Sequence, residues 1–159
     1  NAPLGEAVAA ATPGTVLVVT RQGDRRHAPF GGLMARMAVA KGVVGVVIDG
    51  AATDLREIVE LRLPVFARNL SALTTRRQNL PGTVGEPVVC GGVLVHQGDI
   101  VLGDDDGVVV VPAEEAEPLL RRAYRFEEWE HVMRAGLVAG LAPAEARARA
   151  DADVDRSVY

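Results

Sequence analysis

Three short apolar runs rich in β-branched residues alternate with helical segments in the first half of the chain, and this alternation restricts the fold more than any other feature. The runs cover residues 15–20, 43–49 and 63–69. The middle run, VVGVVID, shows no polar alternation, which is typical of a strand buried on both faces of a sheet. The segments around these runs carry apolar residues at the intervals typical of a helix. This strand–helix–strand order predicts a parallel sheet flanked by helices, and therefore an α/β fold.

The second half of the sequence changes character. Residues 86–112 form a series of short apolar runs separated by Gly and Asp, which predicts short strands. Within them, GDDDG at 103–107 favours a hairpin with an Asp-Gly turn, although it also resembles a calcium-type acid cluster. A long helical region is predicted over 113–137, with an interruption near Pro118. The remaining residues are Ala-rich and charged.

Composition excludes several classes of protein. Of the 159 residues, 48% are hydrophobic, which excludes a disordered chain. The formal net charge of −4 argues against broad nucleic-acid binding. One cysteine permits no internal disulfide. The apolar runs are too short to span a membrane, and we see no signal peptide, so we expect a cytoplasmic protein without membrane or nucleic-acid partners.

Two carboxylates mark the end of the middle strand, in the segment DGAATD at residues 49–54. Asp49 closes the strand, Asp54 opens the next helical segment, and the residues between them carry little bulk. Asp54 is a suitable N-cap, and Asp49 suits a structural role at the strand end. The alternative is a site where a metal ion and a small acid meet. The residues alone leave both interpretations open.

Several motifs taken together resemble the RraA-like family. They are GGLMARMAVAKGVVGVVIDGAATDLREI, LPVFAR, VVCGGVLVHQGDIVLGDDDGVVVVP and EEWEHVMRAGL. The family includes class II 4-hydroxy-4-methyl-2-oxoglutarate aldolases and the regulator of ribonuclease activity A. The resemblance implies a single compact α/β/α domain of the phosphohistidine-swivelling-domain type with a mixed sheet, over residues 1–141. A charged helical tail then covers 142–159. It also implies a homotrimer or hexamer, and a family N-terminal segment that this sequence does not include.

The resemblance implies a chemistry as well. Aldolases of this family cleave or decarboxylate short 2-oxo acids, such as oxaloacetate, without a Schiff base. A divalent metal stabilises the enolate that forms when the carbon–carbon bond breaks. Mg²⁺ or Mn²⁺ fits such a site, because the ligands are oxygen atoms and water.

Carried over position by position, the match at the strand end is partial. Asp54 falls on the metal-binding and catalytic acid of the family motif. Thr53, the second candidate catalytic and substrate-binding position, stands where the family has an Arg that grips the substrate carboxylate. Arg56 is a poor substitute, because residues two apart on a helix face different ways. Arg76 or Arg77 lies near the place where family enzymes often have Lys.

The turn before the second helical segment is the candidate substrate cradle. Gly31, Gly32, Leu33 and Met34 fall on a family turn whose backbone N–H groups hold a carboxylate. Gly32 replaces the acid that the family usually has there. A plain tight turn is the alternative interpretation of this stretch.

Three further acids are candidates to support the metal site. They are Asp49, at the strand end, and Glu127 and Glu128, in the C-terminal helical region. In family enzymes an acid from the neighbouring subunit's C-terminal helix helps to order metal-bound water, and either glutamate fits that position. A solvated helix face is the alternative for both.

Three functions remain open on this basis. The first is a metal-dependent lyase acting on a short 2-oxo acid. The second is an enzyme with an altered, less anionic substrate, which Thr53 favours. The third is a non-catalytic RraA-like module that regulates or binds another protein, which the changes at Thr53 and Gly32 favour.

Overall fold

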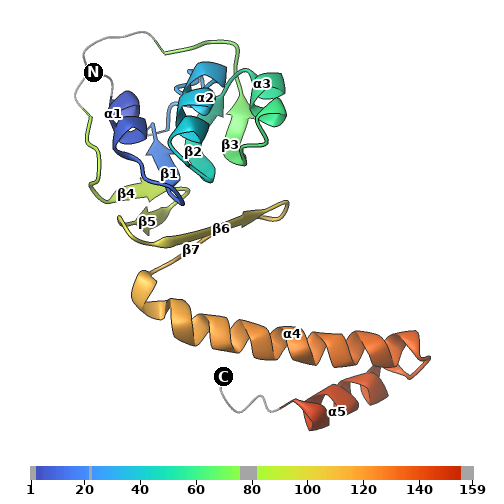
Figure 1. The fold of residues 1–159 in the computed structure, drawn as a ribbon. Coiled ribbons are helices and arrows are strands. Elements are labelled where there is room, and N and C mark those ends of the chain that lie inside the picture. The colour runs from blue at the N-terminus through green and yellow to red at the C-terminus, as the bar shows by residue number, and fades with distance from the viewer. Residues whose placement is uncertain (1–2, 22, 76–81, 155–159) are drawn as a thin grey trace. The chain divides into compact units, whose positions relative to one another are not determined.

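The computed structural model describes residues 3–21, 23–75 and 82–154. It divides into two units, Asn1–Val111 and Pro112–Tyr159. Parallel and antiparallel strands occur together with helices (Figure 1), so the predicted mixed α/β fold class is confirmed.

A three-stranded parallel sheet forms the centre of the first unit. Its strands are β1 (Val16–Thr20), β2 (Gly45–Ala52) and β3 (Val65–Leu70), with β2 in the middle. Each lies within or next to a run that the sequence marked as apolar and β-branched. Three helices accompany them: α1 (Pro3–Ala10), α2 (Gly32–Ala40) and α3 (Leu55–Glu60). Gly42 follows the end of α2 with a φ of +76°, a left-handed conformation that suits glycine.

The two faces of the sheet have different coverings. Val46 and Ile48 of β2 pack with buried residues of the helices, among them Ala35 of α2 and Ile58 of α3. Val47 faces the other way, because side chains alternate along a strand. It lines a small apolar cavity together with residues of the following hairpins. Within the first unit, helices therefore cover one face of β2 and hairpins the other, which explains its unbroken apolar run.

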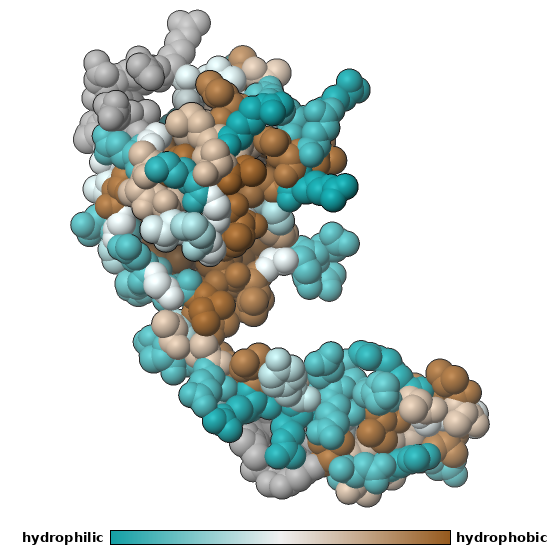
Figure 2. Space-filling model, viewed as in Figure 1, coloured by the Kyte–Doolittle hydropathy of each residue, from teal (hydrophilic) through white to brown (hydrophobic). Residues whose placement is uncertain are grey.

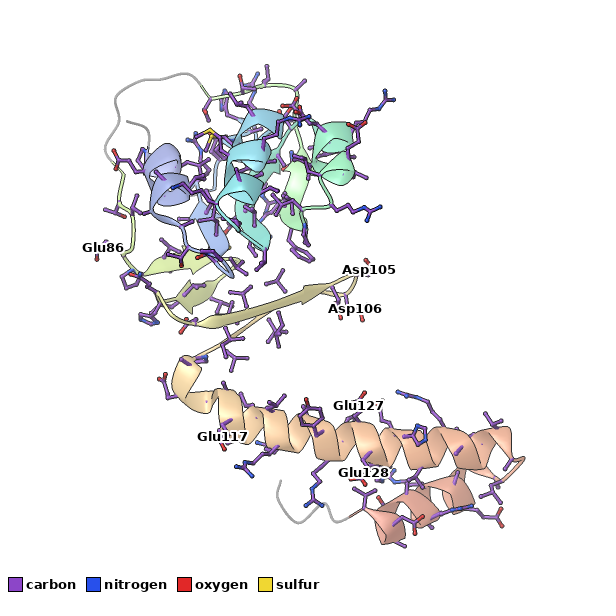
Figure 3. All side chains as sticks on the ribbon, in the orientation of Figure 1. Glu86, Asp105, Asp106, Glu117, Glu127 and Glu128 are labelled. Atoms are coloured by element: carbon purple, nitrogen blue, oxygen red, sulfur yellow. The ribbon has the colours of Figure 1, made fainter. Side chains whose placement is uncertain are left out.

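Two antiparallel hairpins complete the first unit. One pairs β4 (Val88–Cys90) with β5 (Val93–Val95), and the other pairs β6 (Ile100–Asp104) with β7 (Gly107–Val111). The predicted GDDDG hairpin exists, but its turn is shifted by one residue. Asp104 pairs with Gly107, so Asp105 and Asp106 form the loop, and Figure 3 shows both at the hairpin tip.

The second unit is helical. A short 3₁₀ turn, η1 (Ala113–Glu115), leads into α4 (Ala116–Val138), and α5 (Pro143–Asp153) packs back on α4. The predicted interruption near Pro118 is wrong. Pro118 is the third residue of α4, where no intrahelical N–H bond is lost. The sequence-based boundary after residue 141 falls between α4 and α5, which the structure joins in one unit.

In the described part of the chain, none of the helices has the length and apolar character needed to cross a bilayer.

Asp49 of β2 connects this strand with β3 and with the turn between β4 and β5. Its carboxylate pairs with Arg68 of β3 and accepts a hydrogen bond of 2.9 Å from the Gly91 N–H, in the β4–β5 turn. The Arg68 guanidinium, followed by the Gly91 N–H, holds the pKa of the Asp49 carboxyl below its usual range. The side chain is 19% exposed, so water screens the pair only in part.

This connection predicts an acid-dependent stability. A lowered folded-state pKa stabilises the fold above the unfolded-state pKa of about 3.9 and is lost as the pH falls through the folded-state value. We expect Asp49→Asn to be less stable than wild type at pH 7, and the difference to shrink steadily below about pH 4. Urea unfolding should be followed by far-UV circular dichroism, because the single tryptophan, Trp129, lies in the second unit.

Asp105→Asn, at the exposed hairpin tip, is the matched control and should change stability little at either pH. Parallel loss of stability in wild type and Asp49→Asn on acidification would contradict the role given to Asp49.

Candidate functional site

The candidate residues follow the carboxyl end of β2. In open parallel sheets this edge is where ligands bind, because successive loops meet there. Thr53 and Asp54 come directly after β2 and precede α3. The Thr53 N–H donates to the Phe30 carbonyl at 3.0 Å, which ties this loop to the residue preceding the glycine turn at 31–32. The fold therefore brings the two sequence motifs together, 22 residues apart in the chain.

The Asp54 side chain accepts a hydrogen bond from the neighbouring helix, α2, and does not cap its own helix, α3. It occupies the N-cap position of α3, yet its side chain makes no capping bond there. Its Oδ2 accepts a hydrogen bond of 2.9 Å from the N–H of Gly32, the first residue of α2. The backbone of Asp54 is left-handed, with φ 56° and ψ 41°, a conformation that Asp tolerates better than most residues.

The two glycines make this approach possible. A Cβ atom on Gly31 would lie 2.6 Å from Oδ2 of Asp54 and 2.6 Å from Cγ2 of Thr53. A Cβ atom on Gly32 would lie 1.9 Å from Oε2 of Glu57. Side chains at 31 and 32 would therefore occupy the space that acids of the next loop and helix now fill.

Two carboxylates thus meet at the beginning of α2. The Asp54 carboxylate binds a first-turn N–H, where the helix dipole favours negative charge. Glu57 of α3 lies against Gly32 and pairs through Oε1 with Nε of Arg36, one turn further along α2. Sequence analysis missed Glu57 and Arg36. The available signal was their spacing, because Glu57 follows Asp54 by three residues and Arg36 follows Gly32 by four.

The cradle residues differ in what their side chains do. Leu33 is 72% exposed, whereas Met34 packs against the core. The backbone N–H groups of both belong to the first turn of α2, ahead of the first helical bond from the Ala35 N–H to the Gly31 carbonyl. First-turn N–H groups have no partner within their own helix, so they are available in principle to an anion.

An open depression adjoins Asp54. It is lined by residues from the end of β2, the start of α3 and the end of β3: Thr53, Asp54, Leu55, Leu70, Ser71 and Ala72. Asp54 therefore binds the glycine turn through the Gly32 N–H and also borders this depression. The depression leaves room for a small molecule beside the carboxylate.

The remaining predicted positions do not gather around Asp54 within the first unit. Both carboxylate oxygens of Asp49 are engaged, one by Arg68 and the other by the Gly91 N–H, which supports the structural interpretation. Glu127 and Glu128 are exposed on α4 of the second unit (Figure 3). Arg76 and Arg77 lie outside the described residues.

Metal-ligating side chains are sparse. Among the residues that the structure describes, no three or more His, Cys, Asp or Glu side chains are grouped so that they could hold a metal ion. A zinc-type site is not what this donor set offers. A single carboxylate with water and substrate oxygens is a donor set that Mg²⁺ accepts.

Proteins of known name are similar to this chain in sequence. A Halalkalibacterium halodurans protein, provisionally named 4-hydroxy-4-methyl-2-oxoglutarate aldolase, is 35% identical over 77% of this chain and 58% of its own. The 4-hydroxy-4-methyl-2-oxoglutarate aldolase of Thermus thermophilus is 35% identical over 62% of this chain and 60% of its own. The chain therefore spans about three fifths of the length of these relatives.

A solved structure is also similar. A Streptomyces coelicolor protein, named as an unusual member of the RNase ES inhibitor RraA protein family, matches with a TM-score of 0.77 and 34% identity. The match covers 83% of this chain and 67% of that one. The RraA-like family model, described as Aldolase/RraA, matches residues 1–110, which contain every residue of the glycine turn and the Asp54 loop. The chain belongs to the RraA-like family.

Proposed function

We propose that this chain is a divalent-metal-dependent carbon–carbon lyase that acts on a short 2-oxo acid, by retro-aldol cleavage or by decarboxylation. The observation that carries the proposal is the Asp54 carboxylate, which leaves its own helix uncapped and lies at the start of α2 beside an open depression. Relatives named as aldolases of an oxoglutarate derivative support the same class of reaction.

Asp54 would hold the ion, Mg²⁺ or Mn²⁺, with water and substrate as its other ligands. A divalent ion there would supply charge stabilisation for an enolate. The chain's own residues bind and orient the substrate. The first-turn N–H groups of Leu33 and Met34 orient the substrate carboxylate, and the α2 dipole favours its negative charge. Thr53, lining the depression, offers a hydroxyl to the substrate.

Gly31 and Gly32 keep the loop and helix α3 close enough for this geometry. Because a Cβ at either position would collide with Thr53, Asp54 or Glu57, larger side chains would move Asp54 away from α2. The glycines therefore act by positioning the acid and the N–H groups relative to each other.

A second function is supported by a specific observation. Thr53 stands where an Arg would grip the substrate, and solved relatives are named as RNA-processing or RNase inhibitors. A non-catalytic regulatory module that binds another protein would tolerate this change. The two functions differ in whether Asp54 is needed for turnover.

The lyase proposal predicts metal-dependent release of pyruvate from oxaloacetate or 4-hydroxy-4-methyl-2-oxoglutarate. Asp54→Ala should lower kcat/KM by about tenfold to a hundredfold, because a charge-assisted contact is lost. A coupled pyruvate assay with and without Mg²⁺ or Mn²⁺ measures this. Glu60→Gln, an exposed acid at the far end of α3, is the control and should behave as wild type.

Activity that does not respond to metal, or to Asp54→Ala, would remove the lyase proposal. Absence of turnover in wild type, with Asp54→Ala folded normally, would favour the regulatory module instead.

Position 53 gives a second prediction. Thr53→Arg should raise kcat/KM on a dicarboxylic 2-oxo acid by about tenfold to a hundredfold, because a guanidinium binds a carboxylate bidentately. Adding Gly32→Asp should remove part of that gain, because the new Cβ would meet the Glu57 carboxyl group at 1.9 Å. The two variants are compared in the same pyruvate assay. An equal or larger rate in the double variant would show that Glu57 gives way without cost.

Assembly is the third expectation. Apolar side chains of the first unit are exposed on the hairpins, and Figure 2 shows apolar surface over them: Val89, Val93, Leu94, Leu102 and Val109 are each at least half exposed. Contiguous exposed apolar surface is typical of subunit contacts. We expect a trimer or hexamer by light scattering at micromolar concentration, with Leu102→Lys shifting the distribution toward monomer. A monomeric wild type would contradict this.

A further inference from the structure

Arg36 places a guanidinium group in the first half of α2. It follows Gly32 by four residues, so the two positions lie on the same face of the helix. Helical side chains lean toward the N-terminus of their helix, which directs Arg36 toward Gly32. Its side chain is 56% exposed, so a ligand can reach it.

One carboxyl group separates Arg36 from the first residue of the helix. Oε1 of Glu57 pairs with Nε of Arg36, while Oε2 of the same carboxyl lies where a Cβ of Gly32 would stand. The N–H of Gly32 in turn binds Asp54. Arg36, Glu57 and Asp54 are therefore linked around a single glycine.

We propose that Arg36 is a specificity-determining residue that binds the second carboxylate of a dicarboxylic 2-oxo acid, a role that rests on the proposed lyase function. Two protein carboxylates already stand at this point, so a dianionic substrate needs a cation beside them. The guanidinium carries five N–H donors in a fork, and its ion pair with Glu57 is formed through Nε. An incoming carboxylate therefore competes with Glu57 for Arg36.

The offset along α2 matches the shape of such a substrate. Arg36 follows Leu33 by three residues and Met34 by two, a rise of about 3–4.5 Å, so its base lies further along α2 than the N–H groups proposed for the 2-oxo acid head. In an oxoglutarate-type acid, two carbons separate the 2-oxo head from the distal carboxylate. A monocarboxylic 2-oxo acid such as pyruvate would not extend to Arg36. The chain should therefore prefer dicarboxylic acids through this residue.

Glu57 distinguishes this role from a simple clamp between α2 and α3. If the ion pair only held the helices together, removing either partner would weaken binding and stability in the same direction. If Arg36 binds substrate, Glu57→Gln frees the guanidinium and tightens binding of the dianion. Arg36→Met and Glu57→Gln should then act in opposite directions.

The experiment is titration calorimetry of the full chain in Mg²⁺ with two probes, 2-oxoglutarate and pyruvate. Arg36→Met should weaken 2-oxoglutarate binding by about tenfold to a hundredfold and leave pyruvate binding unchanged. Glu57→Gln should strengthen 2-oxoglutarate binding, and Arg36→Lys should retain part of it, because it keeps the charge without the fork. Arg56→Met, an exposed arginine of α3, is the matched control and should bind both probes as wild type does.

Binding separates this inference from the proposed function. If wild type shows no turnover but Arg36→Met still loses 2-oxoglutarate selectively, the lyase proposal fails and the role of Arg36 stands. If wild type turns over oxaloacetate and Arg36→Met binds 2-oxoglutarate unchanged, the role of Arg36 is overturned alone. Equal weakening for both probes, equal loss in Glu57→Gln, or no binding of either probe by wild type would also overturn it.

Discussion

The burial of β2 between two different layers is the constraint on which the first unit depends. Val46 and Ile48 are almost fully buried on the helical side, while Val47 faces the hairpins. A one-residue slip would exchange the side chains of the two faces, so the different coverings favour one register up to Ile48. The pairing with β3 shifts between Ile48 and Ala51, and the strand then ends at Ala52, directly before Thr53 and Asp54. The Thr53 N–H bond to the Phe30 carbonyl then ties this loop to the residue preceding the glycine turn.

The elements could largely be predicted, because their signals are local. The apolar runs at 15–20, 43–49 and 63–69 predicted β1, β2 and β3, and the short runs at 86–112 predicted the strands of the hairpins. The errors were also local. The hairpin turn moved from Asp-Gly to Asp105–Asp106, since the pairing of β6 with β7 sets which residues form the loop. Pro118 did not interrupt α4, because the first turn of a helix does not use its N–H.

The contacts within the candidate site were harder to predict. The sequence placed Asp54 at a helix start, where capping its own helix was the simplest interpretation. Its left-handed backbone instead aims the carboxylate at α2, a direction that no local pattern specifies. Likewise, the sequence indicated only that Gly32 replaces an acid that the family usually has at this position. Only the packing of α2 against α3 shows that the carboxyl of Glu57 fills that space. The type of each element could be predicted from one sequence, but the direction of these side chains depends on how the elements pack together.

The two acids of DGAATD now have separable roles, and the separation follows from charge. Asp49 is neutralised by the Arg68 guanidinium and satisfied by the Gly91 N–H, so a cation would gain little from it and would have to displace an existing ion pair. Asp54 binds a backbone N–H at the positive end of a helix and also borders an open depression. A hydrogen bond from a neutral N–H leaves the formal charge of the carboxylate in place. The same short segment therefore contains one acid whose carboxylate is engaged by β3 and the β4–β5 turn, and one that would hold the divalent ion in the proposed lyase.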